Sequence, residues 1–146
     1  MTPSKRFVLV AADDNPDDRL LLQAAWEETA VVDLFLVEDG EALIQFLRHQ
    51  GKYVDTETIP QPHLILLDLR MPRKNGYEVL QEIKTDPILR RIPVVVFTTS
   101  TARSDIERSY DLGANTCTTK PESFEDLLQM TQTLYQYWFK TMRLPS

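Results

Sequence analysis

The chain has 146 residues, which on a scale of about 100 to 200 residues per domain leaves room for one domain. Lys and Arg number 16 against 22 Asp and Glu, a net charge of −6, and this acidic balance argues against binding to nucleic acid or to an anionic membrane surface. No apolar stretch approaches the roughly 18 residues that a membrane span needs. The single cysteine, Cys117, cannot form an internal disulfide, which suits a reducing compartment. We therefore expect a cytoplasmic protein with one domain over residues 1–146 and no separate output domain.

Short apolar runs rich in β-branched residues alternate with longer segments of helical periodicity. The runs are 7–12, 33–37, 63–67, 92–97 and 114–119. The helical segments are 16–29, 41–50, 76–85, 103–112 and 123–140, with Asn15 and Ser123 as candidate N-caps and Gly51 and Gly113 as stop signals. The stretch 52–63 is expected to be a surface loop. This alternation predicts an α/β protein with a doubly wound, five-stranded parallel sheet that has helices on both faces.

Polar residues follow the predicted strands at the end where ligands bind in open parallel sheets. Asp13 and Asp14 follow the first strand, Asp68 follows the third, Thr98 follows the fourth and Lys120 follows the fifth. We expect these side chains to meet. Thr99 and Ser100 are interpreted as ordinary strand-end hydroxyls.

Three carboxylates packed together need compensation, because two like charges 4 Å apart cost about 4 kcal/mol at an effective dielectric constant near 20. A divalent cation and Lys120 together would balance the three negative charges of Asp13, Asp14 and Asp68. Oxygen ligands with open positions suit Mg²⁺, which prefers one or two carboxylates together with a phosphate. The sequence therefore predicts a Mg²⁺ site that receives a phosphoryl group.

These motifs resemble those of the receiver domains of two-component response regulators, over nearly the whole chain. The matching stretches are AADDN with Asp13 and Asp14, LLDLRMPRKNGYEVL with Asp68, VVVFTTS with Thr98, and TTKP with Lys120. DPILRRIPVVVFTTS and the aromatic end LYQYWFKTMRLP are most similar to the single-domain regulators paired with cyanobacterial phytochrome histidine kinases. The resemblance implies the flavodoxin-like receiver fold, with strand order 2-1-3-4-5.

The resemblance also implies a mechanism. Asp68 would accept a phosphoryl group from a sensor histidine kinase, with Asp13, Asp14, Asp68 and the backbone carbonyl of Arg70 holding Mg²⁺. The chain is not expected to be an enzyme beyond catalysing its own phosphorylation and dephosphorylation. Lys120 and Thr98 would contact phosphoryl oxygens, and Thr98 would draw its loop inward. The Lys120-Pro121 peptide bond is expected to be cis.

Two positions depart from the usual receiver pattern. Arg70 stands where a small polar residue is common, and its guanidinium could reach the phosphoryl group or block water, which leaves the lifetime of an acyl phosphate open. Cys117 stands where a switching aromatic ring is common, so either another group reports the state or the conformational change is small. His49 and His63 are interpreted as structural residues, and Tyr77 and Trp26 as packing residues.

Three other functions fit the sequence less well. A Mg²⁺-dependent phosphohydrolase with Asp68 as nucleophile would need a second acid where Arg70 stands. A flavodoxin-like FMN carrier would need a phosphate-binding loop where the chain has DDNPDD. An unphosphorylated dimeric scaffold is disfavoured by the intact motif residues. In every case the downstream effector is not identified by the sequence.

The C-terminal segment carries two apolar stripes about 100° apart. The first is Phe124, Leu128, Thr131, Tyr135, Trp138 and Met142, and the second is Leu127, Met130, Leu134 and Tyr137. The first stripe is expected to pack on the sheet, and part of the second to face outward. Either the helix has a broad core-facing arc, or the face formed by 103–112, 114–119 and 123–140 is a homodimer interface, as the resemblance also implies.

Overall fold

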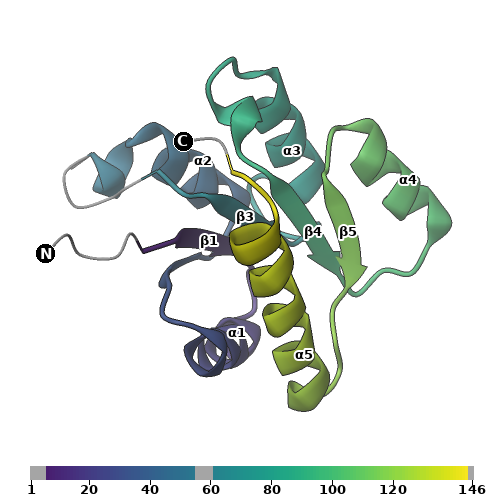
Figure 1. The fold of residues 1–146 in the computed structure, drawn as a ribbon. Helices are drawn as coiled ribbons and strands as arrows, with labels where there is room; N and C mark the ends of the chain where they lie inside the picture. Colours follow the sequence, from purple (N-terminus) through teal and green to yellow (C-terminus); the bar gives the residue numbers. More distant parts are fainter. Residues whose placement is uncertain (1–5, 55–60, 145–146) are drawn as a thin grey trace, which may run out of the picture.

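The fold is a five-stranded parallel sheet with strand order β2-β1-β3-β4-β5, seen in a computed structural model that describes residues 6–54 and 61–144 (Figure 1). The strands are β1 (Val8–Ala12), β2 (Asp33–Val37), β3 (Leu64–Leu67), β4 (Val94–Thr98) and β5 (Thr116–Thr119). The helices are α1 (Pro16–Thr29), α2 (Gly40–Arg48), α3 (Gly76–Thr85), α4 (Arg103–Asp111) and α5 (Phe124–Leu134). The predicted fold class and strand order are confirmed.

Helices cover both faces of the sheet, as Figure 1 shows. Alternate side chains of β1 point to opposite faces, because the side-chain period of a strand is two. Val10 and Ala12 belong to the hydrophobic core on the side of α2 and α3, whereas Leu9 and Ala11 belong to the core on the side of α1 and α5. The central strands β1, β3 and β4 are wholly buried, which explains their continuous apolar sequence.

Side-chain caps fix where the helices begin. The Asn15 side chain accepts hydrogen bonds from the N–H groups of Asp17 and Asp18, and Pro16 occupies the first turn of α1. The Ser123 side chain accepts from the Asp126 N–H at the start of α5. Both predicted N-caps are therefore confirmed, and each one sets the direction in which its helix leaves the end of a strand.

The predicted ends of the elements shift by a few residues. Helix α2 ends at Arg48, before Gly51, because His49 already adopts the left-handed conformation (φ 54°). Gly51 then begins a short 3-10 helix, η1 (Gly51–Tyr53). Residues 55–60 of the predicted loop lie outside the described part of the chain. A second 3-10 helix, η2 (Leu89–Arg91), precedes β4.

The sequence predicted one helix over 123–140, but the C-terminal segment is not one regular α-helix. After Leu134 the chain continues as a π-helix, η3 (Tyr135–Thr141). Its wider turns place Phe139 against Phe7, with the two rings stacked at 4.5 Å between centroids. The face that packs on the sheet therefore lies between the two predicted stripes: Leu134 and Phe139 are buried, whereas Tyr137 and Met142 are exposed.

The peptide bond before Pro121 was predicted to be cis, and this prediction is wrong because all described peptide bonds are trans. An X-Pro bond favours trans by about 0.5–1 kcal/mol unless its surroundings reverse the preference. Among the described residues, no helix combines the length and the apolar character required to cross a membrane.

Candidate functional site

The sheet itself places the candidate residues. Asp13, Asp68 and Lys120 each follow the last residue of a strand, and each backbone N–H still bonds to the neighbouring strand. The Asp13 N–H donates to the Val37 carbonyl at 3.1 Å, and the Asp68 N–H donates to the Ala12 carbonyl at 3.1 Å. The Lys120 N–H donates to the Thr98 carbonyl at 2.8 Å. Parallel pairing therefore aligns these positions along one edge of the sheet.

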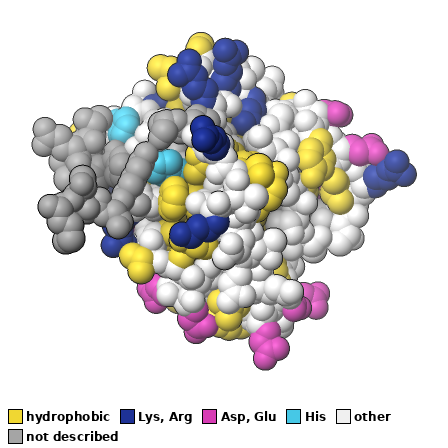
Figure 2. All heavy atoms as spheres, in the orientation of Figure 1, with side chains coloured by type: hydrophobic (Ala, Val, Ile, Leu, Met, Phe, Trp, Pro, Cys, Tyr) yellow, Lys and Arg dark blue, Asp and Glu magenta, His cyan; other side chains and the backbone are white. Residues whose placement is uncertain are grey.

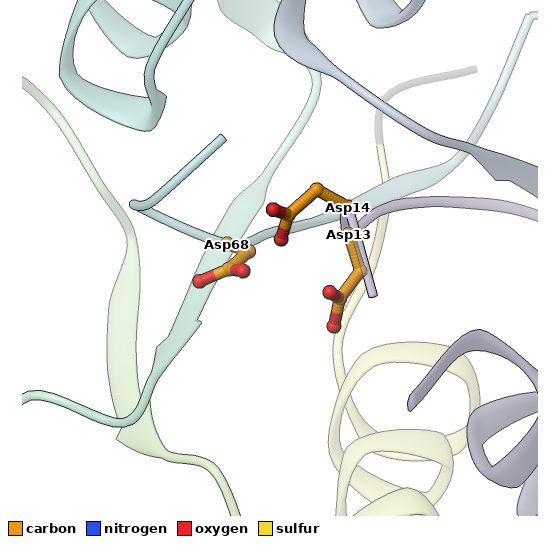
Figure 3. A group of neighbouring side chains, drawn as sticks. All are labelled: Asp13, Asp14 and Asp68. Carbon is orange, nitrogen blue, oxygen red and sulfur yellow. The ribbon is translucent and has the colours of Figure 1, made fainter. Parts of the chain in front are cut away.

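Asp13, Asp14 and Asp68 form the acidic cluster, drawn in Figure 3. Each residue offers a carboxylate oxygen, and the three oxygens lie within 4.8 Å of one another. Asp13 and Asp68 are buried, whereas Asp14 is exposed at the rim. The structure therefore brings together the three carboxylates that the sequence placed at two strand ends.

The Lys120 ammonium lies among carboxylates. Its Nζ atom is 2.7 Å from Asp13 Oδ2, 3.1 Å from Asp18 Oδ2 and 3.3 Å from Asp68 Oδ2. Burial would lower the pKa of Lys120, but the contacts with Asp13, Asp68 and Asp18 outweigh burial and raise this pKa above its usual value. Lys120 is therefore a fixed positive charge in the acidic cluster.

Asp68 has the opposite balance. Burial raises its pKa, Asp13 raises it further, and the attraction of Lys120 opposes both without cancelling them. Ionisation of this carboxyl group is thus less favourable in the folded protein than in water. One ammonium does not compensate the charge that the fold has collected at this position.

The acidic cluster fits a divalent cation. Asp13 Oδ2 is buried and has no aligned hydrogen bond within the described chain, although the Lys120 ammonium is close to it. The other Asp13 oxygen accepts from the Asn15 N–H at 3.0 Å, so the carboxylate is held in one orientation. Three carboxylates that share one ammonium are a donor set that hard cations such as Mg²⁺ and Mn²⁺ accept.

Arg70 has a backbone contact to the acidic cluster and an exposed side chain. Its N–H lies 3.4 Å from Asp68 Oδ1. It also lines a surface depression of about 500 Å³ that Asp14, Met71 and Tyr77 border. The predicted use of its carbonyl as a metal ligand stays a prediction.

Gly76, the first residue of α3, packs against the loop that follows Asp68. A Cβ atom at this position would lie 2.6 Å from the Asp68 carbonyl oxygen and 2.6 Å from Leu69 Cα, which is closer than real Cβ contacts. The Gly76 N–H donates to the Leu69 carbonyl at 2.9 Å. Helix α3 therefore supports the backbone of the acidic cluster by direct contact.

On the side of β4, Thr98 begins a series of hydrogen bonds that reaches α3 and α4. Buried Thr98 accepts the Ser100 N–H on its Oγ1 at 3.2 Å. The Ser100 hydroxyl donates to Asp105 Oδ2 at 2.5 Å, and the Tyr77 hydroxyl donates to Asp105 Oδ1 at 2.7 Å. We call Ser100, Asp105 and Tyr77 the α3–α4 bridge. The Arg108 guanidinium lies over the Tyr77 ring at 4.0 Å.

The hydrogen bonds of the bridge shift the pKa of its acidic groups. Bonds from Ser100 and Tyr77 lower the pKa of Asp105. Burial, together with the bond to Asp105, raises the pKa of Tyr77 to about 12. The interpretations of Tyr77 as a packing residue and of Ser100 as an isolated hydroxyl are therefore incomplete.

Two other contacts were missed by sequence reasoning. Asp18 pairs with Lys120, and Arg19 donates from Nη1 to the Asp13 carbonyl at 2.6 Å. Both residues lie in the first turns of α1. The motif DDNPDDR signalled an acidic helix start, but a contact between residues 18 and 120 depends on the packing of α1 against α5, the helix that follows Lys120.

Cys117, His49 and His63 lie outside the acidic cluster and have contacts within the fold. Cys117 is half-buried beside the α2 and α3 core, its N–H donates to the Tyr110 hydroxyl at 3.1 Å, and burial raises the pKa of its thiol. His63 accepts the Val8 N–H on Nδ1 at 3.0 Å. His49 ends α2. The candidate metal cluster found among the described residues includes neither histidine.

Comparisons with known proteins agree with this geometry. The chain matches the response regulator receiver domain family over residues 8–132. It is 42% identical to the response regulator Rcp1 of Synechocystis sp. over 141 residues, which is 97% of this chain and 94% of that protein. The crystal structure of the phosphorylated cyanobacterial phytochrome response regulator RcpA superposes with a TM-score of 0.90 at 40% identity, covering 97% of this chain and all of that one.

A second structure, the Mn²⁺-bound form of Rcp1, superposes with a TM-score of 0.85 at 42% identity, covering 96% of this chain and 99% of that chain. The likeness thus spans the sheet, the acidic cluster and the C-terminal helix together. The chain belongs to the response regulator receiver domain family.

Proposed function

We propose that Asp68 accepts a phosphoryl group with the help of Mg²⁺, so that the chain acts as a phosphorylated signalling switch. The observation that carries this proposal is the buried Asp68 carboxylate, which lies beside the Lys120 ammonium and within 4.8 Å of the carboxylates of Asp13 and Asp14. The arrangement supplies a nucleophile, a fixed positive charge and oxygen ligands for a cation. Phosphoryl transfer requires these same parts.

In the transfer, an Asp68 oxygen attacks the phosphorus atom while the bond from phosphorus to the donor atom breaks. The electron pair of that bond leaves with the donor, and the product is an acyl phosphate on Asp68. Lys120 is placed to neutralise charge on the phosphoryl oxygens. Thr98 supplies a hydroxyl from the end of β4. A cation held by Asp13, Asp14 and Asp68 would offset charge on the nucleophile and the phosphoryl group.

The donor we propose is the phosphohistidine of a cytoplasmic sensor histidine kinase, of the phytochrome type. The support is the similarity to Rcp1 and to RcpA, which is named as a phytochrome response regulator. Mg²⁺ is proposed over Mn²⁺ because carboxylates with a phosphate suit it. Phosphorylation and dephosphorylation of its own Asp68 would be the limit of its catalysis. The exposed Arg70 stands where a phosphohydrolase would need an acid.

The signal would leave through protein contacts on the side of α4. Cys117 has no ring to report the position of Thr98, but the α3–α4 bridge joins the Thr98 loop to two helices. An inward movement of Thr98 would change its bond with Ser100, and through Asp105 it would change the packing of α4. This is the proposed substitute for the usual aromatic switch.

We also propose a homodimer through the face of α4, β5 and α5. Figure 2 shows hydrophobic side chains near the middle of the face over which the C-terminal helix runs. Tyr137 is 48% exposed, Met142 is 41% exposed and Tyr110 of α4 is 48% exposed, and aromatic and Met side chains are enriched at interfaces. A downstream effector or relay protein would recognise this face or its rearrangement.

Intact-mass spectrometry after incubation with acetyl phosphate and Mg²⁺ tests phosphorylation. The wild-type chain should gain the mass of one phosphoryl group, and Asp68→Asn or an excess of EDTA should abolish the gain. A phosphoryl adduct that survives in Asp68→Asn would show that Asp68 is not the acceptor.

Light scattering at tens of micromolar tests the dimer separately. We expect a dimeric mass in the presence of beryllofluoride and Mg²⁺, and a lower dimer fraction for Tyr137→Ser. A monomeric mass with and without beryllofluoride would contradict the interface and leave the phosphorylation proposal intact.

A further inference from the structure

Asp18 lies outside the acidic cluster but contacts the same ammonium. Its Oδ2 is 3.1 Å from Lys120 Nζ, across 102 positions of sequence. Its side chain is 40% exposed, whereas those of Asp13 and Asp68 are 1% and 7% exposed. The Lys120 ammonium is therefore held between two buried acids inside the site and one half-exposed acid at its edge.

The N-terminal cap of α1 fixes the position of Asp18. The Asn15 side chain accepts the Asp17 N–H at 2.9 Å and the Asp18 N–H at 3.2 Å. Because Asp18 sits in a capped first turn, the carboxylate starts from a restrained backbone. The sequence Asn15-Pro16 thus positions a charge that acts on a distant strand end.

The Lys120 side chain is also held from a second direction. Its ammonium lies over the Phe97 ring, 5.3 Å from the ring centroid. Asp18, Leu22, Phe97 and Pro121 line a small recess of about 40 Å³ together with Lys120. The lining of this recess includes Asp18 but neither Asp13 nor Asp68, so Asp18 contacts Lys120 from outside the acidic cluster.

A bound cation would change how the Lys120 ammonium is shared among Asp13, Asp68 and Asp18. Any cation bound by the acidic cluster competes with Lys120 for Asp13 and Asp68, and its charge repels the ammonium. Asp18 is the carboxylate contacting Lys120 that does not belong to the acidic cluster. We propose that Asp18 is a positioning residue that keeps Lys120 at the edge of the site while Asp13 and Asp68 bind the cation. This inference rests on the proposed function.

The test compares Asp18→Asn with Asp17→Asn, because both remove one negative charge from the same helical turn. Asp17 has its own bond to the Asn15 cap, and no ion pair between Asp17 and Lys120 occurs in the described structure. Mg²⁺ affinity is measured by isothermal titration calorimetry, and the rate of Asp68 phosphorylation is measured with acetyl phosphate at a fixed Mg²⁺ concentration.

For Asp18→Asn we expect Mg²⁺ affinity to fall by about threefold to fivefold, the upper range for a partly exposed ion pair, and phosphorylation to slow as well. Asp17→Asn should change either quantity by less than about twofold, and Asp18→Glu should recover most of the loss, because it restores the carboxylate. Melting temperatures in EDTA should be alike for the two Asn variants.

Equal losses in Asp17→Asn and Asp18→Asn would overturn the inference, because they would reflect general charge alone. Wild-type affinity in Asp18→Asn would also overturn it. Neither result touches the proposed function, which fails instead if the wild-type chain takes no phosphoryl group on Asp68.

Discussion

Two flanks of Asp68 are built from different interactions. On one flank, Lys120 and the carboxylates of Asp13 and Asp18 form ion pairs among β1, α1 and β5. On the other flank, Thr98 leads into the α3–α4 bridge, where hydroxyl groups bond to one half-buried carboxylate, that of Asp105. The first flank has excess negative charge, and the second has its acid satisfied by two donors.

The difference suits one flank to binding a cation and a phosphoryl group, and the other to detecting a movement of Thr98. Ion pairs in a buried cluster respond to any added charge over several ångströms, so the flank of Lys120 is suited to bind a cation and a phosphoryl group. Hydrogen bonds depend strongly on distance and angle, so the flank of the α3–α4 bridge is suited to detect a displacement of Thr98. Substitutions on the two flanks should therefore differ in their response to Mg²⁺.

The largest effect is expected for Lys120→Met, which leaves buried Asp13 and Asp68 without their ammonium. Stability in EDTA at pH 7 should fall by about 3 kcal/mol in urea denaturation, and Mg²⁺ should restore part of it, since a cation replaces the lost charge. Phosphorylation should slow by about 100-fold or more. Lys140→Met, at an exposed position of η3, is the matched control. An unchanged stability in EDTA would show that the ion pairs contribute little.

An effect of opposite sign is expected for Asp68→Asn. Because the pKa of Asp68 is raised in the folded protein, ionisation at neutral pH opposes folding, and the amide oxygen can still accept from Lys120. In EDTA at pH 7 we expect the variant to be more stable by on the order of 1 kcal/mol.

The gain from Asp68→Asn should shrink as the pH falls toward 3.8, the ordinary pKa of an aspartate, because the wild-type carboxyl is then protonated. Mg²⁺ should reverse the order of the two proteins. Thermal melts over this pH range measure the effect, and a lower stability of the variant in EDTA at neutral pH would contradict it.

The smallest effect is expected for Tyr77→Phe, which removes one hydroxyl from the α3–α4 bridge. We expect a loss of about 1 kcal/mol that Mg²⁺ does not change, and a phosphorylation rate within about twofold of wild type. Hydrogen exchange in α4 should respond less to beryllofluoride than in wild type. Tyr110→Phe, on α4 but outside the bridge, is the control. An α4 response equal to wild type would exclude the bridge as the reporting element.

The raised pKa of Tyr77 gives a spectroscopic check. The neutral hydroxyl stabilises the fold below pH 10, the ordinary tyrosine pKa, and this contribution is lost as the pH rises through about 12. An absorbance titration of wild type should therefore contain a tyrosine that stays protonated above pH 10. That component should be missing from Tyr77→Phe and present in Tyr110→Phe.

The sequence was sufficient to predict the features that depend on local sequence patterns, namely the buried strands and the helix caps. Buried strands such as β3 and β4 are continuous apolar runs, and caps such as Asn15 and Ser123 are local signals, so elements were placed to within a few residues. The strand order came from the family resemblance. Parallel pairing then carried Asp13, Asp68 and Lys120 to one edge without further information.

The contacts that were missed depend on how elements pack. Asp18 reaches Lys120 because α1 packs against α5, the helix that follows Lys120, and Tyr77 reaches Asp105 because α3 and α4 are neighbours. The π-helical turns of η3 accompany the stacking of Phe139 on Phe7, more than 130 residues apart by their numbers. No periodicity within a single segment contains this information.

The close packing of Gly76 affects how substitutions near Asp68 would be interpreted. In a library that samples every substitution, Gly76 should tolerate replacement as poorly as Asp68, because a side chain there would displace the Asp68 carbonyl and Leu69. An assay of signalling alone would score the two positions alike. Protein abundance should separate them, since Asp68 variants are expected to accumulate as folded protein and Gly76 variants are not. Gly76 would thus be sensitive to substitution although it contributes no chemical group of its own beside Asp68.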